Sequence, residues 1–234
     1  MITVTLTQET SNSDDVSIVV DNLRASTSIN IALTKFKEII PVLTPEEAQE
    51  KTKEYDAVLA GERNGATLPG FDIGNSPDQL KKLKTGKTSL ILTTTNGTRI
   101  LKQIQSKTIL IGALNNAQAV AKTALEKANH HINIVMAGRK GEFAIEDYLA
   151  SGEIIYQIQK TTEKIKLSPE AEKAINDSRD YNQLKETILS SPAAENLEKL
   201  GFHNDIILAL EKNKYNKVAI YENNKLKGDS VKTQ

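Results

Sequence analysis

Four arginines of the sequence each come shortly after an apolar run that is typical of a strand. They are Arg24, Arg63, Arg99 and Arg139, the last of which is followed by Lys140. A guanidinium group offers a planar fork of N–H donors that matches the oxygen pairs of phosphate, sulfonate and carboxylate groups. Several such side chains at strand ends could converge on one small ligand with two anionic ends. The pattern favours a site for a small dianionic molecule, without requiring every arginine.

Three acidic residues stand where they could bind a metal ion or move a proton. Asp21 directly follows the β-rich residues 16–20, and Glu62 and Asp72 belong to a glycine-rich loop. Mg²⁺ prefers carboxylate oxygens together with water. Asp21 is the preferred candidate, as a metal ligand, as the nucleophile that attacks phosphorus, or as the base that activates water. The structural alternative for Asp21 is a turn residue, and the sequence leaves its role open.

Two hydroxyl side chains, Ser26 and Thr27, follow Arg24 at the start of a predicted helix. Each could act as the nucleophile or donate a hydrogen bond to a phosphate oxygen. Helix capping explains either hydroxyl equally well, because serine and threonine are preferred at the N-cap. The candidate catalytic residues are therefore Asp21, Arg24, Ser26 and Thr27.

Residues 89–101 predict a strand, a turn and a helix in that order. Asn96 is a good N-cap, and Gly97 allows a tight turn. Backbone N–H groups at the helix N-terminus, the Thr95 hydroxyl and the Arg99 guanidinium would together suit a phosphate or sulfonate group. An ordinary capped helix is the alternative, since the segment has neither a Walker loop nor a dinucleotide fingerprint. If the anion site exists, replacing Arg99 with lysine should lower catalytic efficiency about tenfold to a hundredfold.

The loop at residues 61–77 carries Glu62, Arg63, Asp72 and Asn75 among glycines and prolines. Loops of this length in compact domains are usually functional or disordered, and its apolar residues argue against disorder. We therefore expect an ordered loop that presents these polar side chains to a ligand.

A second polar loop, residues 137–147, is a glycine-flanked basic turn that opens onto a helix and presents Arg139 and Lys140. Glu142 and Glu146 are four residues apart and would share one helix face. Acids in a first helical turn stabilise the helix dipole, which is a structural explanation for both.

The composition is that of an ordinary globular protein. The 234 residues include 30 basic and 30 acidic side chains, with no basic stripe and no cysteine. Balanced charge gives no support for a nucleic-acid partner. The absence of cysteine excludes disulfides and thiolate zinc sites and suits a reducing cytoplasm. No signal peptide or membrane-spanning run is recognised, so no membrane partner is expected.

Strands and helices alternate up to residue 149, after which helical patterns dominate until a last strand near residues 218–221. This order predicts an α/β fold with a mostly buried central sheet and a helical C-terminal segment, which could also form an oligomer surface. Residues 1–234 are treated as a single domain. Residues 225–234 are polar and are expected to fray.

The polar motifs together resemble the 2-phosphosulfolactate phosphatase family, the ComB type. The resemblance covers nearly the whole chain. It rests on Asp21-x-Leu23-Arg24-Ala25-Ser26-Thr27, Ala60-Gly61-Glu62-Arg63, Gly70-Phe71-Asp72-x-Gly74-Asn75-Ser76-Pro77, Thr93-Thr94-Thr95-Asn96-Gly97-Thr98-Arg99 and Ala137-Gly138-Arg139-Lys140-Gly141. Departures are Asn213 and Ala219, where the family's aspartate and proline are expected.

The resemblance implies a three-layer α/β/α fold and Mg²⁺-dependent removal of phosphate from 2-phospho-3-sulfolactate, a step toward coenzyme M. A related phosphoester is an alternative substrate. A second hypothesis is a non-catalytic binding protein for a dianionic metabolite. The expected metal ligands are Asp21, Glu62 and Asp72. The expected phosphate-binding and substrate-binding residues are Arg63, Asn75, Thr95, Asn96, Gly97, Arg99, Arg139 and Lys140.

Overall fold

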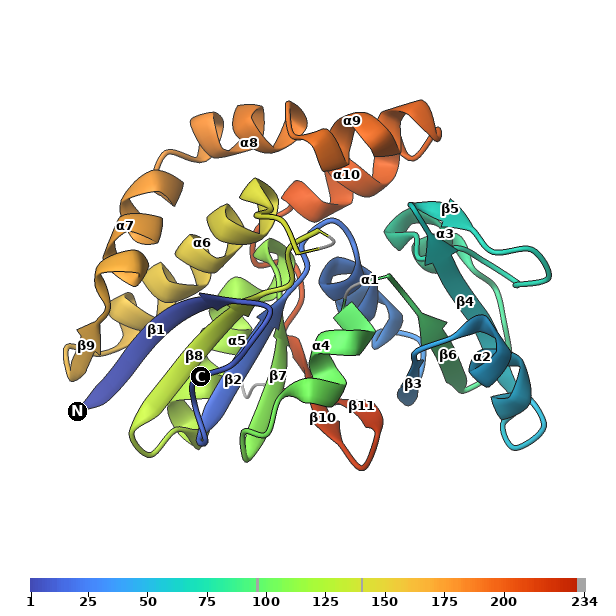
Figure 1. Ribbon diagram of the computed structural model, residues 1–234, viewed down its shortest axis with the longest axis horizontal. Coiled ribbons are helices and arrows are strands. Elements are labelled where there is room, and N and C mark those ends of the chain that lie inside the picture. Colours follow the sequence, from blue (N-terminus) through green and yellow to red (C-terminus); the bar gives the residue numbers. More distant parts are fainter. Residues whose placement is uncertain (96, 140, 231–234) are drawn as a thin grey trace.

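A computed structural model describes residues 1–95, 97–139 and 141–230. Within these residues, eleven strands form one sheet in the order β5-β4-β6-β3-β11-β10-β7-β2-β8-β1-β9 (Figure 1). The strands are β1 (Ile2–Gln8), β2 (Val16–Val20), β3 (Glu38–Val42), β4 (Ala57–Arg63), β5 (Ala66–Thr67), β6 (Ser89–Thr93), β7 (Thr108–Gly112), β8 (His131–Met136), β9 (Ile165–Leu167), β10 (Lys217–Glu222) and β11 (Lys225–Ser230).

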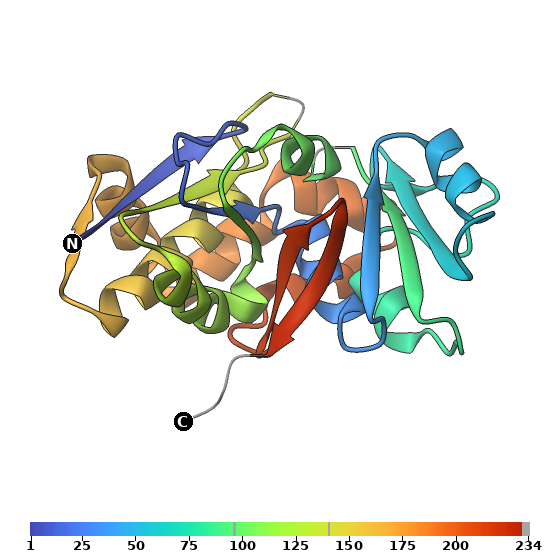
Figure 2. The same ribbon diagram turned by 90° about the horizontal axis from the view of Figure 1, so that it is seen from below.

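Helices pack on both faces of the sheet, so the predicted α/β/α layering is confirmed. The helices are α1 (Ala25–Ala32), α2 (Pro45–Lys51), α3 (Pro77–Lys82), α4 (Gly97–Gln103), α5 (Ala117–Lys127), α6 (Ile145–Thr161), α7 (Pro169–Ser178), α8 (Tyr181–Leu189), α9 (Pro192–Lys199) and α10 (His203–Leu210), with a 3-10 turn at Leu114–Asn116. Figure 2 shows α4 and α5 on opposite faces. None of the helices in the described ranges is long and apolar enough to cross a membrane.

Burial of the strands follows from this layering. All five residues of β2 are buried, because Ile18 packs with α5 and α6 while Val19 packs with α1 and α4. All five residues of β6 are buried for the same reason, with Leu90 and Ile91 in different core clusters. A strand that is covered on both faces reads as a continuous apolar run, which is why these strands were predicted correctly.

The hairpin of β10 and β11 divides the sheet into two parallel groups (Figure 2). One group contains β7, β2, β8 and β1, and the other contains β3, β6 and β4. The prediction that residues 225–234 fray is wrong for β11. Leu226 is fully buried opposite Ile39, and Lys225 forms a salt bridge with Glu38 at 3.0 Å.

Three other features differ from what the sequence suggests. Residues 61–63 extend β4 instead of starting a loop, because Gly61 pairs with β6 and the next two residues pair with β5 in a short hairpin. Residues 1–6 alternate like an edge strand, yet β1 lies inside the sheet, since the short β9 pairs outside it. Glu142 lies before α6, bridged to the backbone of Arg139, so it does not share a helix face with Glu146.

The C-terminal helices α7–α10 form an arc across the top of the view in Figure 1. Serine followed by proline signals the starts of α7 and α9 at Ser168 and Ser191, and both hydroxyls accept a hydrogen bond from a backbone N–H group of the first helical turn. Helix α10 packs on α3, and α9 packs on α10. This arrangement brings the C-terminal segment close to the loops that follow β2 and β4.

Candidate active site

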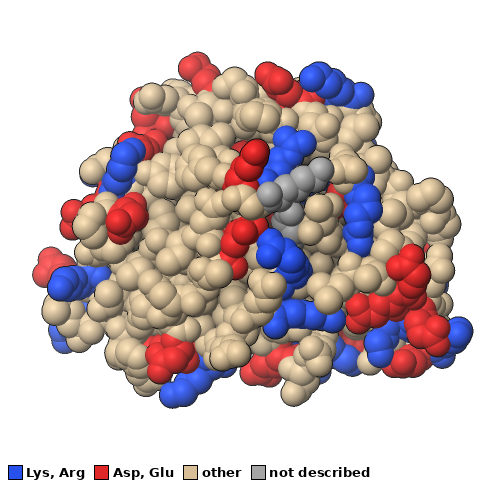
Figure 3. Space-filling model, viewed as in Figure 1, with Lys and Arg blue, Asp and Glu red and all other residues tan. Residues whose placement is uncertain are grey.

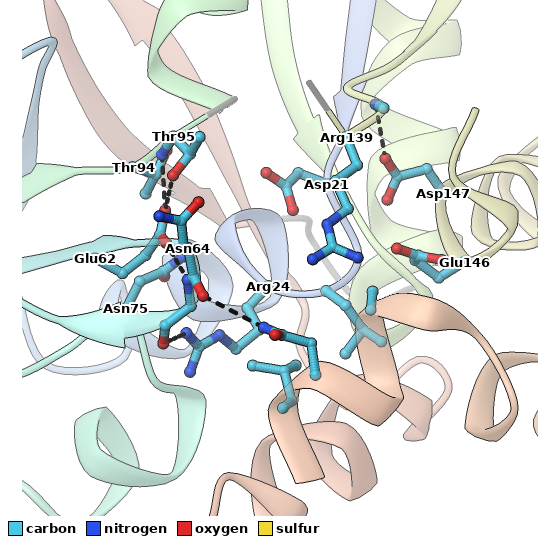
Figure 4. Close-up of a pocket in the computed structure, with 16 residues that line it drawn as sticks. Asp21, Arg24, Glu62, Asn64, Asn75, Thr94, Thr95, Arg139, Glu146 and Asp147 are labelled. Atoms are coloured by element: carbon cyan, nitrogen blue, oxygen red, sulfur yellow. Dashed lines mark hydrogen bonds between the residues drawn. The ribbon is translucent and has the colours of Figure 1, made fainter. Parts of the chain in front are cut away.

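A pocket lies where the loops after β2, β4, β6 and β8 meet the starts of α6 and α9 (Figure 4). It is lined by Asp21, Leu23, Arg24, Glu62, Asn64, Gly65, Asn75, Thr94, Thr95, Gly138, Arg139, Glu146, Asp147, Ala193, Asn196 and Leu197. Both parallel groups of strands therefore contribute to one pocket at their carboxyl ends. This edge is where open α/β sheets bind their ligands.

Asp21 occupies the first position after β2. Its Oδ1 accepts a hydrogen bond from the N–H group of Ala25 at 3.2 Å, and its own N–H group donates to Ser26 Oγ at 2.9 Å. Its Oδ2 accepts no hydrogen bond from the described residues and lies 3.4 Å from where a Cβ on Gly97 would be. Gly97 thus lets the start of α4 approach the carboxylate, and one oxygen stays available to a ligand.

Three carboxyl groups are buried together on one side of the pocket: Asp21, Glu146 and Asp147 (Figure 4). Burial raises the pKa of Asp21 to about 7, with further contributions from the charges of Glu62 and Glu146. Burial raises the pKa of Glu146, and it raises that of Asp147 well above its usual range, helped by the charge of Asp21. Such a cluster is unfavourable when fully ionised unless a cation compensates it.

The side chain of Asp147 binds backbone N–H groups of two loops that form the pocket. Its Oδ1 accepts a hydrogen bond from the N–H group of Asn22 at 2.8 Å, and its Oδ2 accepts one from Gly138 at 3.0 Å. The carboxylate therefore connects the loop after β2 to the loop after β8. Both of its oxygens are used, so Asp147 is better suited to positioning Asp21 and Arg139 than to binding a ligand.

Glu62 has a similar connecting role on the other side of the pocket. Its Oε1 accepts hydrogen bonds from the N–H group and hydroxyl of Thr95 at 2.7 and 2.8 Å, and its Oε2 accepts one from the N–H group of Gly65 at 2.7 Å. The side chain fastens the loop after β6 to the β4–β5 hairpin. Three hydrogen bonds thus use most of the acceptor capacity of Glu62, which suits a connecting role better than metal binding.

Two of the four arginines line the pocket, and they differ in how they are held. Arg139 is exposed, and no described residue forms a hydrogen bond or salt bridge with its guanidinium. Arg24 is buried and donates to Asp205 Oδ2 at 2.7 Å and to the carbonyl of Gly65 at 2.6 Å, with its guanidinium 4.6 Å from the centre of the Phe202 ring. Arg139 is the arginine whose fork is free for an incoming anion.

Comparisons with known proteins show the family of the chain. The family model described as 2-phosphosulpholactate phosphatase matches residues 1–224. The chain belongs to this family. It is 40% identical over 223 residues to the 2-phosphosulfolactate phosphatase of Methanothermobacter thermautotrophicus, covering 95% of this chain and 94% of the relative. It is 37% identical over 221 residues to the 2-phosphosulfolactate phosphatase of Methanocaldococcus jannaschii, covering 91% and 92%. A Clostridium acetobutylicum protein named as a probable 2-phosphosulfolactate phosphatase is 38% identical over 215 residues, covering 90% and 91%.

Several residues predicted for the 2-phosphosulpholactate phosphatase site do line the pocket. They are Asp21, Arg24, Glu62, Asn75, Thr95 and Arg139. Gly97 lies beside Asp21 Oδ2 but does not line the pocket. Asn96 and Lys140 lie outside the described residues.

Ser26 and Thr27 do not reach the pocket. Both are buried within α1, where Ser26 Oγ bonds the backbone of Asp21 and Thr27 Oγ1 donates to the carbonyl of Asn22 at 2.8 Å. Neither hydroxyl is the N-cap, since that position belongs to Arg24. The two side chains stabilise the loop that carries Asp21, and neither is placed to attack a ligand in the pocket.

Arg63 and Arg99 also point elsewhere, so the four arginines do not converge. Successive residues of a strand face opposite sides, and because Glu62 faces the pocket, Arg63 faces away and donates to the carbonyl of Leu43 at 2.9 Å. Arg99 forms a salt bridge with Glu9 at 2.6 Å. The predicted anion site at Arg99 is therefore corrected: its guanidinium is engaged outside the pocket.

Asp72, predicted as a metal ligand, lies away from the other acids. After the loop, the chain runs back alongside β4, where Ile73 forms a β-bridge with Ala60. Asp72 is exposed, and its Oδ2 accepts a hydrogen bond from the N–H group of Leu59 at 2.9 Å. This contact lies back along the strand from the pocket. Asp72 is thus excluded from the cluster around Asp21.

Sequence reasoning did not assign functional roles to Glu146 and Asp147, which it explained by the helix dipole at most. Asp205, together with Leu200-Gly201-Phe202, contributes to the family resemblance, but no role was assigned to it from the sequence; it is fully buried against Arg24. A signal was present for Glu146 and Asp147, because they follow a glycine-flanked basic loop at a strand end. Asp205 lies on a helix far along the chain, and nothing local pairs it with Arg24.

Arg139 and Arg99 provide a matched pair of substitutions. We expect Arg139→Lys to lower kcat/KM about tenfold to a hundredfold, because an ammonium cannot reproduce the paired donors of a guanidinium. Arg99→Lys should leave kcat/KM nearly unchanged, since it alters only a partly exposed salt bridge with Glu9. Steady-state kinetics of both variants test this. Equal losses in the two would return Arg99 to the site.

Proposed function

We propose that this phosphatase hydrolyses the phosphoester of 2-phospho-3-sulfolactate, or a closely related small anionic ester, with the help of Mg²⁺. The observation that carries the proposal is the pocket in which buried Asp21 and Glu146 lie beside the free guanidinium of Arg139. The names of the relatives support the substrate. The reaction would then be a step toward coenzyme M. A cytoplasmic location is proposed from the absence of cysteine alone.

The chain's own groups suit phosphoryl transfer. Hydrolysis forms a bond from a water oxygen to phosphorus and breaks the ester P–O bond, and the leaving oxygen takes a proton. Negative charge on the equatorial phosphoryl oxygens must be neutralised during this exchange. Arg139 is placed to bind those oxygens, and Asp147 holds the Gly138 backbone next to it. Figure 3 shows basic and acidic side chains next to one another near the middle of this face, in keeping with a small anionic substrate.

The residues of the pocket fit Mg²⁺ held partly by water. Among the described residues, no three carboxylates or histidines converge as a ready-made metal site. Mg²⁺ commonly takes only one or two carboxylates, with waters and a substrate phosphate filling the other positions. Asp21, with its free Oδ2, and Glu146 would hold the ion. When bound, it would compensate the clustered carboxylates and neutralise phosphoryl charge.

A panel of esters tests the proposal. With Mg²⁺ present, the purified protein is expected to release phosphate from 2-phospho-3-sulfolactate with a higher kcat/KM than from 2-phospholactate or 4-nitrophenyl phosphate. A preference for another small ester would change the substrate and keep the reaction. Binding of the esters without release of phosphate from any of them would favour a non-catalytic binding protein.

A further inference from the structure

The pocket has two chemically different sides (Figure 4). The carboxyl groups of Asp21 and Glu146 lie with Arg139 on one side. Asn75 lies on the other, and Arg24 lies between them. The reacting phosphate and Mg²⁺ have a clear place on the first side. The second side has no function yet.

Asn75 is the most unusual residue of the second side. It is only 3% exposed, and its Oδ1 is a buried atom that forms no hydrogen bond with any described residue. Buried amides in native proteins are almost always hydrogen-bonded. An amide can present either its oxygen or its NH₂ group at a given place, so this side chain can offer two donors to an anion. With the amide turned so that its NH₂ group takes this place, the unpaired group is a donor, and we take its missing partner to be an acceptor atom of the ligand.

Asn75 and Arg24 are fixed by the same buried carboxylate. Asp205 on α10 is fully buried, and its Oδ2 accepts from Arg24 at 2.7 Å. Its Oδ1 accepts from the hydroxyl of Ser76 at 2.7 Å and from the N–H group of Asp78 at 3.0 Å. The loop that carries Asn75 and the guanidinium of Arg24 are therefore held in one arrangement before a ligand binds. Such preorganisation reduces the entropic cost of ordering these side chains when a ligand binds.

The second side presents donors but no free carboxylate. Both oxygens of Glu62 are hydrogen-bonded to Thr95 and Gly65, and both oxygens of Asp205 are occupied. The donors of Thr95 and Gly65 partly compensate the charge of Glu62, and Arg24 compensates Asp205, so an anionic group beside Asn75 meets no unpaired carboxylate among the described residues of this side. These are the properties needed for a part of the substrate that does not react.

We propose that Asn75 binds one of the two anionic groups of the substrate that are not transferred, the sulfonate or the carboxylate, with the paired guanidinium of Arg24 beside it, while the phosphate lies beside Asp21, Glu146 and Arg139. This proposal rests on the proposed function, because it assigns the second anionic group of the same substrate class. It makes Asn75 a specificity-determining residue. Esters that lack a second anionic group gain nothing from it.

The test uses Asn75→Asp, which keeps the shape of the side chain and replaces its NH₂ donors with a repelling oxygen. For 2-phospho-3-sulfolactate, kcat/KM should fall about tenfold to a hundredfold, mainly through KM. For ethyl phosphate, which has no second anion, the change should stay below about threefold. Phosphoisethionate, with only a sulfonate, and 2-phospholactate, with only a carboxylate, show which group Asn75 recognises. The control is Asn182→Asp, which makes the same change at an exposed position of α8.

An equal loss for ethyl phosphate and the dianionic esters would overturn the proposal, because Asn75 would then serve the reacting phosphate. No loss for any ester would overturn it as well.

Binding of 3-sulfolactate, measured by calorimetry, is independent of turnover and should weaken at least about tenfold in Asn75→Asp. If the wild-type protein released no phosphate but this weakening were found, the proposed function would fail and the subsite would stand. Wild-type protein that binds no 3-sulfolactate would reject the subsite. Should Asn75→Asp not fold, Asn75→Ala is compared on the same ligands with the same expected and contrary outcomes.

Discussion

Replacing Asp21 with asparagine is expected to lower kcat about a thousandfold and leave the fold intact. The substitution keeps the shape of the side chain, and the amide oxygen of the new asparagine can still accept the hydrogen bond from the N–H group of Ala25. It removes the negative charge that either metal binding or proton transfer requires. Because burial raises the pKa of Asp21 to about 7, removing this carboxyl group should not weaken the folded state near neutral pH. The loss should therefore appear in turnover and not in stability.

Phosphate release on the best ester and the midpoint of thermal unfolding measure the two parts of this prediction. Asp72→Asn is the matched control, because Asp72 is an exposed aspartate outside the pocket that also accepts one backbone N–H group. It should retain full activity. A loss of only a few-fold in Asp21→Asn, with an unchanged response to Mg²⁺, would give Asp21 a purely structural role.

Most strands and helix starts could be predicted because their causes are local. Residues 16–20 form an apolar run long enough for a buried strand, and Ser76 and Ser191 precede prolines at helix starts. The β10–β11 hairpin could not be predicted in the same way. Its second strand is polar except at Leu226, and it becomes a strand by pairing along β10 and by burying Leu226 opposite Ile39 of β3, which is far away in the sequence.

The sequence predicted which strand ends carry the candidate site, but it predicted less well which side chains point into the pocket. Asp21 and Arg139 follow strands whose ends are clear in the sequence, and both line the pocket. Glu62 and Arg63 were assigned to a loop, yet they continue β4, and the alternation of a strand decides which of them faces the ligand. The salt bridge of Arg99 with Glu9 joins residues 90 positions apart, which no local pattern reveals.

Removal of Mg²⁺ is expected to abolish phosphate release and to make the stability of the protein depend on pH. In the metal-free protein, the pKa of Asp21 is raised from 3.8 to about 7. The folded state therefore keeps a proton on Asp21 across this range, whereas the unfolded chain has lost it. The free energy of unfolding should fall as the pH rises from about 4 to about 7. Glu146 and Asp147, whose pKa values are also raised, contribute in the same direction.

Mg²⁺ should reverse this loss, because the ion binds the ionised carboxylates and competes with their protons. Its stabilising effect should grow from pH 5 to pH 8 and be much smaller in Asp21→Asn. Urea unfolding in EDTA and in Mg²⁺ at several pH values measures this effect, and a parallel assay of phosphate release measures activity. Burial opposes ionisation of Asp15, but the N–H donors around it outweigh this effect and lower its pKa to about 2. Asp15 therefore titrates below pH 4 and does not contribute to the change in stability between pH 5 and pH 8. Full activity in EDTA after exhaustive chelation, with no change in stability on adding Mg²⁺, would remove the metal from the mechanism and leave Arg139 as the main counter-charge to the phosphoryl group.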